Sequence, residues 1–173
     1  TMFTADGWLR TGDLVSMEDG RVHITGRLKH ILVLSNGENV NPEPIETALL
    51  GDPLFDQVCV LGDGRSFLGA LLVLQADEWA RMAEEEGLDA DAPNGAAAQA
   101  AIRARVRARL TDMPAHAQIR AFHATTAPWT LEDGLLTPTL KLRREKVKAA
   151  MADEIAALFR PEGQGAARAR ARG

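Results

Sequence analysis

A run of positive charge at the start of the last expected helix is the feature of this sequence best suited to chemistry. The helix is expected over residues 140–159, and its first turn contains four cations: Lys141, Arg143, Arg144 and Lys146. A helix N-terminus is already positive, so carboxylates are preferred there. Exposed backbone N–H groups, the helix dipole and a lysine behind a Thr-Pro-Thr loop would together hold a phosphate or a carboxylate. The alternative is that these long side chains extend into water and bind nothing.

The sequence contains no other familiar catalytic or metal-binding pattern. Signatures of catalytic triads, HExxH helices, EF-hand loops and Walker-type phosphate loops are absent. The single cysteine, Cys59, lies in an apolar run, which excludes a disulfide framework and leaves a thiolate zinc site short of ligands. We therefore expect Cys59 to be buried and inert. Four histidines lack the spacing of metal ligands and receive no role: His23, His30, His116 and His123.

Composition indicates a soluble globular protein with an uneven distribution of charge. Of 173 residues, 46% are hydrophobic and 25% charged, and no window approaches the ~20 apolar residues of a membrane span. The N-terminus lacks the basic start and apolar core of a signal peptide, so a cytoplasmic location is expected. Residues 1–95 hold 6 basic and 17 acidic side chains, whereas residues 96–173 hold 14 and 7.

The basic half could bind an anionic partner, but its pattern argues against nucleic acid. Alternating arginines point around much of a helix and have no aromatic residues between them. We expect most of these charges to be solvated. They are Arg103, Arg105, Arg107 and Arg109.

The elements that must position these residues are short strands and helices. Residues 1–27 are expected to form a β-hairpin around a Glu-Asp-Gly turn, and Asn41 and Gly51 mark the ends of a helix that starts with proline. Residues 161–173, rich in alanine, arginine and glycine, are expected to be disordered. The other expected elements are a strand at 30–34, a polar loop at 35–39, strands at 58–62 and 67–74, helices at 77–86 (capped by Asp77) and 94–110, a strand at 119–126 and the helix at 140–159.

The order of the expected strands and helices predicts an α+β fold. Residues 30–160 would form a small mixed sheet with covering helices, in the order β-α-β-β-α-α-β-α, preceded by the hairpin. A hairpin alone is marginally stable in water, so another part of the protein should support it.

Three separated segments carry a resemblance to a known family. They are residues 6–14 (DGWLRTGDL), 26–46 (GRLKHILVLSNGENVNPEPIE) and 136–144 (LTPTLKLRR). In this order they resemble the C-terminal part of the acyl-adenylate-forming superfamily, which includes acyl-CoA synthetases, luciferases and adenylation domains of peptide synthetases. The last two segments look most like the long-chain fatty-acyl-CoA synthetase branch. The resemblance extends over about residues 5–160.

The resemblance implies a nucleotide site on the hairpin. Asp13 corresponds to the carboxylate that accepts hydrogen bonds from the two ribose hydroxyls of ATP or of the acyl-adenylate. Arg27 corresponds to an arginine that contacts the nucleotide, and Ile24 to the apolar residue packed against the nucleoside. The alternatives are a carboxylate that stabilises a turn for Asp13 and ordinary strand core for Ile24.

The same resemblance implies a hinge and a loop that lies along the path of pantetheine. Lys29 matches the position about which the small domain rotates relative to the large one, and a charged residue can stay solvated in both orientations. After the rotation, the loop containing Ser35, Gly37 and Glu38 would line the pantetheine path, with Gly37 leaving room for it.

Lys141 matches the lysine that reaches the carboxylate and the α-phosphate during adenylation. Fatty acid and ATP are both anions, so a positioned cation offsets their repulsion and stabilises charge on the transferring group. In many relatives a glycine precedes this lysine, whereas Leu140 does so here, and this difference also looks typical of the long-chain branch.

The resemblance also implies a fragment of a larger enzyme. Residues 1–28 would be the last hairpin of the large adenylating domain, residues 29–160 the mobile C-terminal domain, and residues 161–173 a disordered tail. The phosphate loop, the Mg²⁺ ligands and the acyl tunnel would lie in that N-terminal domain, the partner of this chain, so the chain alone should be inactive. No nucleic acid is expected as a partner, and at most a peripheral contact with a membrane.

The implied reaction is the ATP-dependent formation of acyl-AMP from a long-chain fatty acid, followed by domain rotation and thioester formation with CoA. One alternative is an adenylating enzyme that passes its acyl group to the phosphopantetheine of a carrier protein. Another is a non-catalytic module that binds an acidic partner through its basic half.

Overall fold

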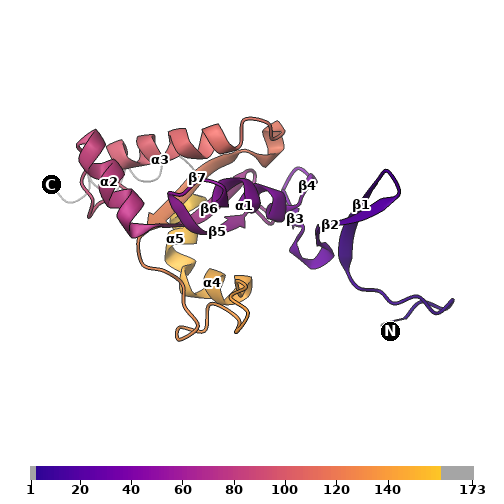
Figure 1. Cartoon of the computed structure of the whole chain (residues 1–173). Helices are drawn as coiled ribbons and strands as arrows, with labels where there is room; N and C mark the ends of the chain where they lie inside the picture. Colours follow the sequence, from indigo (N-terminus) through magenta and orange to yellow (C-terminus); the bar gives the residue numbers. More distant parts are fainter. Residues whose placement is uncertain (1–2, 161–173) are drawn as a thin grey trace.

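A two-stranded hairpin precedes a small α+β domain (Figure 1). The computed structural model describes residues 3–160. Among them, none of the helices combines the length and the apolar character required to cross a bilayer. The elements are β1 (Asp13–Glu18), β2 (Arg21–Arg27), the 3₁₀ turn η1 (Leu28–His30), β3 (Leu32–Val33), β4 (Asn39–Val40), α1 (Pro42–Leu50), β5 (Phe55–Leu61), β6 (Leu68–Leu74), α2 (Ala76–Glu86), α3 (Ala96–Arg109), η2 (Ala115–Ala117), β7 (Ile119–Thr125), α4 (Arg144–Ala150) and α5 (Ala152–Leu158).

The domain is built on a mixed three-stranded sheet in the order β5-β6-β7. Strand β6 pairs antiparallel with β5 and parallel with β7. Alternate residues of β6 enter two separate cores, with Leu72 on the side of α1, α2 and α3 and Leu71 on the side of α4 and α5. Because both faces are covered, every residue of β6 is buried. The predicted α+β class, with a mixed sheet, covering helices and a preceding hairpin, is confirmed.

Local signals explain most helix ends. The side chain of Asn41 caps α1 by accepting a hydrogen bond from the Glu43 N–H at 3.2 Å, as predicted. Helix α2 begins one residue before the predicted Asp77, and its cap is Gln75, whose side chain accepts from the Glu78 N–H at 2.7 Å. The prediction of Asp77 as the cap is wrong because that residue lies inside the first turn.

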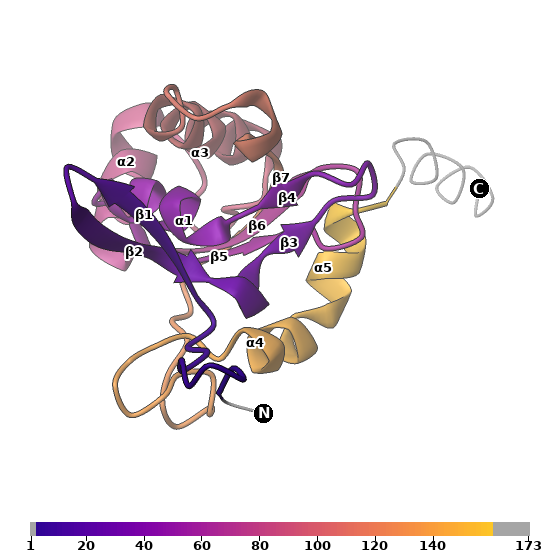
Figure 2. The same ribbon diagram turned by 90° about the vertical axis from the view of Figure 1, so that its right-hand side faces the viewer.

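The last helix differs most from its prediction. Residues 140–143 are not helical, and two short helices, α4 and α5, replace the single one expected over residues 140–159 (Figure 2). Met151 separates them with φ −109° and ψ 31°, outside the α-helical region. The predicted disordered tail, residues 161–173, lies outside the described residues.

The predicted strand at 30–34 and the polar loop after it form a smaller unit than expected. Strands β3 and β4 contribute two residues each to an antiparallel pair. Their turn is closed by the Leu34 N–H donating to the Glu38 carbonyl at 2.9 Å. Gly37 takes φ +86° in this turn, a value that favours glycine.

The hairpin contacts the domain through a narrow junction. The Asn41 side-chain amide donates to the Thr25 carbonyl at 2.7 Å. Gly26 is buried here, and a Cβ on it would lie 2.6 Å from the Asn41 amide nitrogen, so the close approach requires glycine. Outside this junction the N-terminal segment is not covered by the domain, and its large apolar side chains are exposed: Phe3, Trp8, Leu9, Val15, Met17, Val22 and Ile24.

Candidate active site

Two of the three residues expected to bind nucleotide contact each other in the hairpin. Asp13 and Arg27 are opposite residues of β1 and β2. The Arg27 Nε lies 2.8 Å from the Asp13 carboxylate, and the Arg27 side chain is 58% exposed. The Asp13 side chain is 18% exposed. Because Arg27 is largely in solvent, the pair contributes little free energy, and the guanidinium can leave Asp13 to contact an incoming ligand.

Ile24, the third residue of this group, is 72% exposed. It pairs with Val15 across the hairpin, and opposite residues of an antiparallel pair project from the same face. The expected apolar contact for a nucleoside is therefore an open surface, which gives no support to the alternative that Ile24 is core.

Lys29 occupies the single 3₁₀ turn between the hairpin and the domain. The turn is closed by one backbone hydrogen bond, from the Ile31 N–H to the Leu28 carbonyl at 3.3 Å. The residue before it, Arg27, has extended φ and ψ, and Lys29 itself is exposed. A connection this short can change direction through a few dihedral angles.

The loop at residues 35–38 brings together three expected pantetheine-path residues. Ser35 is held by its N–H, which donates to the Arg65 carbonyl at 2.9 Å, and Glu38 lies 3.9 Å from His116. Apart from its two chain neighbours, no residue among 3–160 has a heavy atom within 4 Å of the position that a Cβ on Gly37 would take. Beside the loop is a hollow of about 230 Å³, lined by residues from 34–38, 66–68 and 115–120.

Lys141 lies in a tight turn that precedes α4. The Thr137 N–H donates to the Lys141 carbonyl at 2.8 Å, and the Lys141 N–H donates to the Thr137 hydroxyl at 3.0 Å. Leu140 completes the turn with φ +59°, a conformation that costs an L-residue about 1 kcal/mol or more. The Lys141 side chain is exposed, and among residues 3–160 only its backbone forms hydrogen bonds.

The prediction that Lys141 and Arg143 lie in the first turn of a helix is wrong, whereas anion binding by Lys141 stays a prediction. Helix α4 begins at Arg144, so Lys141 and Arg143 precede the helix and do not belong to its first turn. The carbonyl and the N–H of Lys141 are both hydrogen-bonded to Thr137. The carbonyl is therefore not free to accept the first hydrogen bond of a helix.

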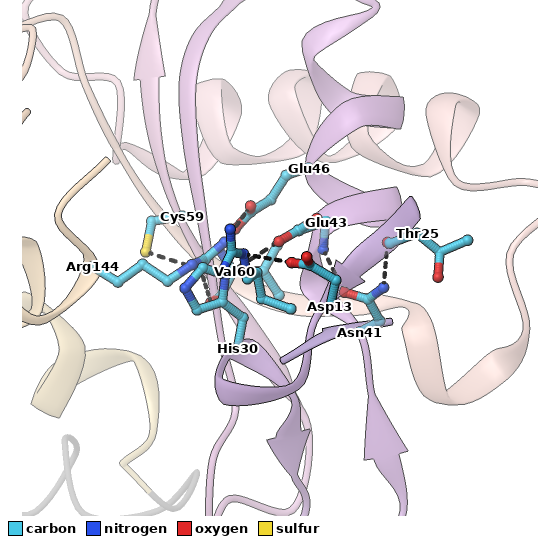
Figure 3. A network of polar contacts seen from close by, with 10 residues as sticks. Asp13, Thr25, His30, Asn41, Glu43, Glu46, Cys59, Val60 and Arg144 are labelled. Atoms are coloured by element: carbon cyan, nitrogen blue, oxygen red, sulfur yellow. Dashed lines mark hydrogen bonds and ion pairs between the residues drawn. The ribbon is translucent and has the colours of Figure 1, made fainter. Parts of the chain in front are cut away.

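Arg144 is not a free cation either, because it belongs to a buried network (Figure 3). Its guanidinium forms an ion pair with Glu46 of α1 and donates to the Val60 carbonyl of β5 at 3.3 Å. The second Glu46 oxygen accepts from the Val60 N–H at 2.7 Å. Burial is the largest single effect and lowers the Arg144 pKa, but the hydrogen bond that Arg144 donates to Glu46 and the negative charge of Glu46 together outweigh it, so the net shift of the pKa is upward.

Three of the four alternating arginines also form hydrogen bonds within the domain, although none of them is buried. Arg103 donates to the Arg120 carbonyl at 2.7 Å, and Arg109 to the Ala48 carbonyl at 2.9 Å. Arg105 forms two hydrogen bonds with the buried Asp52, at 3.0 and 2.7 Å. These side chains attach α3 to the rest of the domain.

A comparison with known families now identifies the fold. The model of the family described as AMP-binding enzyme C-terminal domain matches residues 29–163. The chain belongs to this family.

Several relatives of this AMP-binding C-terminal domain are much longer proteins. The long-chain-fatty-acid–CoA ligase FadD15 of Mycobacterium tuberculosis is 35% identical over an alignment of 163 residues, which covers 91% of this chain and 27% of the ligase. Among solved structures, the adenylation domain of the carboxylate reductase from Mycobacterium chelonae has a TM-score of 0.78 at 30% identity, covering 91% of this chain and 24% of that one. The A-PCP didomain of the carboxylic acid reductase from Segniliparus rugosus, solved with AMP, has a TM-score of 0.77 at 29% identity, covering 91% and 21%. The chain thus spans about a quarter of the length of these relatives.

The expected site residues lie in separate places, and three of them precede the AMP-binding C-terminal domain. Asp13, Ile24 and Arg27 lie on the hairpin, whereas the loop that contains Lys141 lies below the sheet, away from the hairpin (Figure 1). A groove of about 600 Å³ is lined by residues 29–32 at the start of the domain and by residues 142–146.

Sequence reasoning missed Glu46 and the role of Arg144. Glu46 follows Ile45 and precedes Leu49 by three residues, on the buried side of α1. A carboxylate on an apolar helix stripe indicates a buried cationic partner, and this signal could have found the pair.

Proposed function

We propose that this chain is the C-terminal part of a long-chain fatty acid:CoA ligase. The complete enzyme would form acyl-AMP and pyrophosphate from a fatty acid and ATP, rotate its small domain, and transfer the acyl group to CoA. The observation that carries the proposal is the 35% identity to the ligase FadD15, which extends over 91% of this chain.

The proposed nucleotide residues are Asp13, Arg27 and Ile24. A carboxylate suits two adjacent ribose hydroxyls, and the exposed Arg27 can exchange its contact with Asp13 for a phosphate or ribose oxygen. The open apolar side chain of Ile24 supports stacking of the nucleoside against β2.

Lys141 is proposed to act in adenylation. It is exposed, and its backbone is fixed while its side chain extends from the turn, as a group that must reach a substrate requires. Its charge would offset the repulsion between the fatty carboxylate and the α-phosphate, and would stabilise the charge that develops on the transferring phosphoryl group.

Rotation about Lys29 is proposed to exchange Lys141 for the loop at residues 35–38. The hinge is a single 3₁₀ turn, and the two groups of residues lie on different surfaces of the domain. After rotation, Ser35, Gly37 and Glu38 would line the path of the pantetheine arm.

The proposed partner of this chain is a large N-terminal adenylating domain. We propose that residues 1–28 belong to it and that residues 29–160 form the mobile domain. The exposed apolar side chains of the hairpin support this division, because patches of this kind are normally covered. Within residues 3–160, no three His, Cys, Asp or Glu side chains come together to hold a metal ion, and the Mg²⁺ ligands are assigned to the large domain.

Changing Lys141 to Ala in the full-length enzyme that contains this chain tests the proposal. Fatty-acid-dependent ATP–pyrophosphate exchange should fall by about 100-fold or more, because one preorganised charge contact is worth that much to such a transition state. Thioester formation from supplied acyl-AMP and CoA should stay close to that of the unmodified enzyme. Equal losses in both half-reactions would rule out this role for Lys141.

The carrier-protein acceptor is the second candidate. The solved structures of carboxylate reductase adenylation domains favour it, since one of them includes a carrier (PCP) domain and covers 91% of this chain. Purified full-length enzyme, given acyl-AMP with either CoA or a phosphopantetheinylated carrier protein, would distinguish the two. Exclusive transfer to the carrier would replace the CoA ligase proposal.

A further inference from the structure

The chain is attached firmly to the domain three residues after Lys141. Arg144, the first residue of α4, reaches between α1 and β5, and its side chain is 14% exposed while that of Glu46 is 12% exposed. Nearer to Lys141, Leu142 packs against the core below the sheet and forms an isolated antiparallel bridge with Leu136. The Arg143 N–H donates to the Leu135 carbonyl at 2.8 Å, and neither contact involves a charged group or reaches α1.

The network around Arg144 is complete and therefore has one preferred geometry. Both oxygens of Glu46 are used, one by Arg144 and the other by the Val60 N–H. Arg144 also donates to the Val60 carbonyl and contacts the Cys59 sulfur at 3.8 Å. A planar guanidinium with several fixed acceptors holds its own backbone in one orientation.

We propose that Arg144 is a positioning residue for Lys141: its buried contacts with Glu46 and Val60 fix the start of α4, and thereby the direction in which Lys141 projects from the domain. This inference rests on the proposed role of Lys141 in adenylation. Lys141 would then keep a fixed position relative to the domain, and rotation of the domain would place it beside the α-phosphate with little further rearrangement. Preorganisation of this kind depends on supporting residues attached to strands and helices.

The first variant is Arg144→Met in the full-length enzyme. It removes the fork of donors and keeps a side chain of similar length. The kcat of adenylation should fall by ~10- to 100-fold, because displacement of a reacting group by about 1 Å has an effect of that size. The KM for ATP and thioester formation from supplied acyl-AMP should each change by less than about threefold, because Lys141 is proposed to act only in the adenylation transition state.

Arg105→Met is the matched control. Arg105 also forms two hydrogen bonds with a buried carboxylate, Asp52, but it lies on α3, on the other side of the sheet from Lys141. A comparable fall in melting temperature with unchanged adenylation is expected for this variant. Equal losses of adenylation in the two variants would overturn the proposal.

The double variant Glu46→Met with Arg144→Met separates positioning from folding. Replacing a buried ion pair by two apolar side chains can restore stability because no unpaired charge stays buried. Melting temperature should recover toward that of the unmodified enzyme while adenylation stays low. If adenylation recovers together with stability, the pair is merely structural and the proposal fails. This variant also answers the question if Arg144→Met alone does not fold.

Lys141→Ala measured in parallel shows which of the two ideas fails. Normal adenylation in Lys141→Ala would remove the proposed role of Lys141, and the positioning role of Arg144 with it. Loss of adenylation in Lys141→Ala together with normal adenylation in Arg144→Met would overturn the positioning role alone. Loss in both, with normal thioester formation and a normal Arg105→Met control, is the expected result.

Discussion

Cys59 illustrates how the surroundings of a residue decide its chemistry. Its side chain is fully buried on β5, beside Arg144. A neighbouring cation by itself would favour a thiolate, yet burial is the larger effect and raises the pKa of Cys59 to about 12. The thiol is thus neutral at physiological pH, and Glu46 is the group that balances the charge of Arg144.

The raised pKa of Cys59 predicts a loss of stability at alkaline pH. The folded chain keeps the thiol proton up to about pH 12, whereas the unfolded chain releases it near the ordinary value of 9.0. The stability that the protonated Cys59 thiol contributes is therefore fully present below pH 9, and it falls as the pH rises from 9 toward 12. Urea unfolding of the chain and of Cys59→Ala should show a difference in stability that is constant below pH 9 and then falls by about 1.4 kcal/mol per pH unit at most.

Other groups that titrate between pH 9 and 12 do not affect this difference. The chain contains no tyrosine, and the lysines are the same in both proteins. Parallel curves for the two proteins between pH 8 and 11 would contradict the buried, protonated thiol.

At the scale of elements, the sheet was predictable and the start of the last helix was not. The apolar runs of β5 and β6 lack polar alternation, which indicates strands covered on both faces, and both cores are found. Residues 140–143 have good helix formers, but the Thr137 hydroxyl and backbone bind Lys141 and override that local preference. The pairing of β3 with β4 involves too few residues to produce a periodic pattern.

The candidate site was likewise predictable only where its residues lie within short motifs. The motif segments point to Asp13, Lys29 and Lys141 because each lies within a short run of residues. Glu46 and Arg144 are 98 residues apart, and their contact depends on how α1, β5 and α4 pack. A local pattern can indicate that Glu46 needs a buried cationic partner, but it cannot say which cation, so the structure is needed to identify Arg144.

The turn before α4 yields a prediction at the same scale. Leu140 has φ +59° and is 69% exposed, so its side chain contributes little by burial and its backbone conformation dominates. Leu140→Gly should leave the free energy of unfolding within about 1 kcal/mol, because relief of the positive φ and the greater freedom of unfolded glycine oppose each other. Leu140→Val should lose about 1–2 kcal/mol, since β-branched residues are the least tolerant of this region.

Urea unfolding of the two variants measures these changes, and adenylation by the full-length enzyme should follow the same order. A Val variant as stable as the unmodified chain would show that the turn does not need the left-handed conformation.

At the scale of the whole molecule, the orientation of the hairpin relative to the domain assigns this structure to one half of the proposed cycle. Asp13 and Arg27 lie on the hairpin, and the loop with Lys141 lies away from it (Figure 1). Adenylation would require Lys141 to approach the nucleotide residues. The orientation described is thus the one in which Lys141 is withdrawn, as thioester formation would require.

Lys29→Pro should hold the enzyme in this orientation. Proline fixes φ near −65°, which matches the φ of a 3₁₀ turn, and within residues 3–160 the Lys29 N–H donates no hydrogen bond that proline would remove. The other orientation requires dihedral changes at the hinge, which proline resists. In the full-length enzyme we expect adenylation to fall by about 10-fold or more and thioester formation from supplied acyl-AMP to persist. Lys29→Ala, which leaves φ free, is the control and should preserve both half-reactions. Equal loss of both in the proline variant, or loss in the alanine variant, would show that rotation at Lys29 does not separate the two steps.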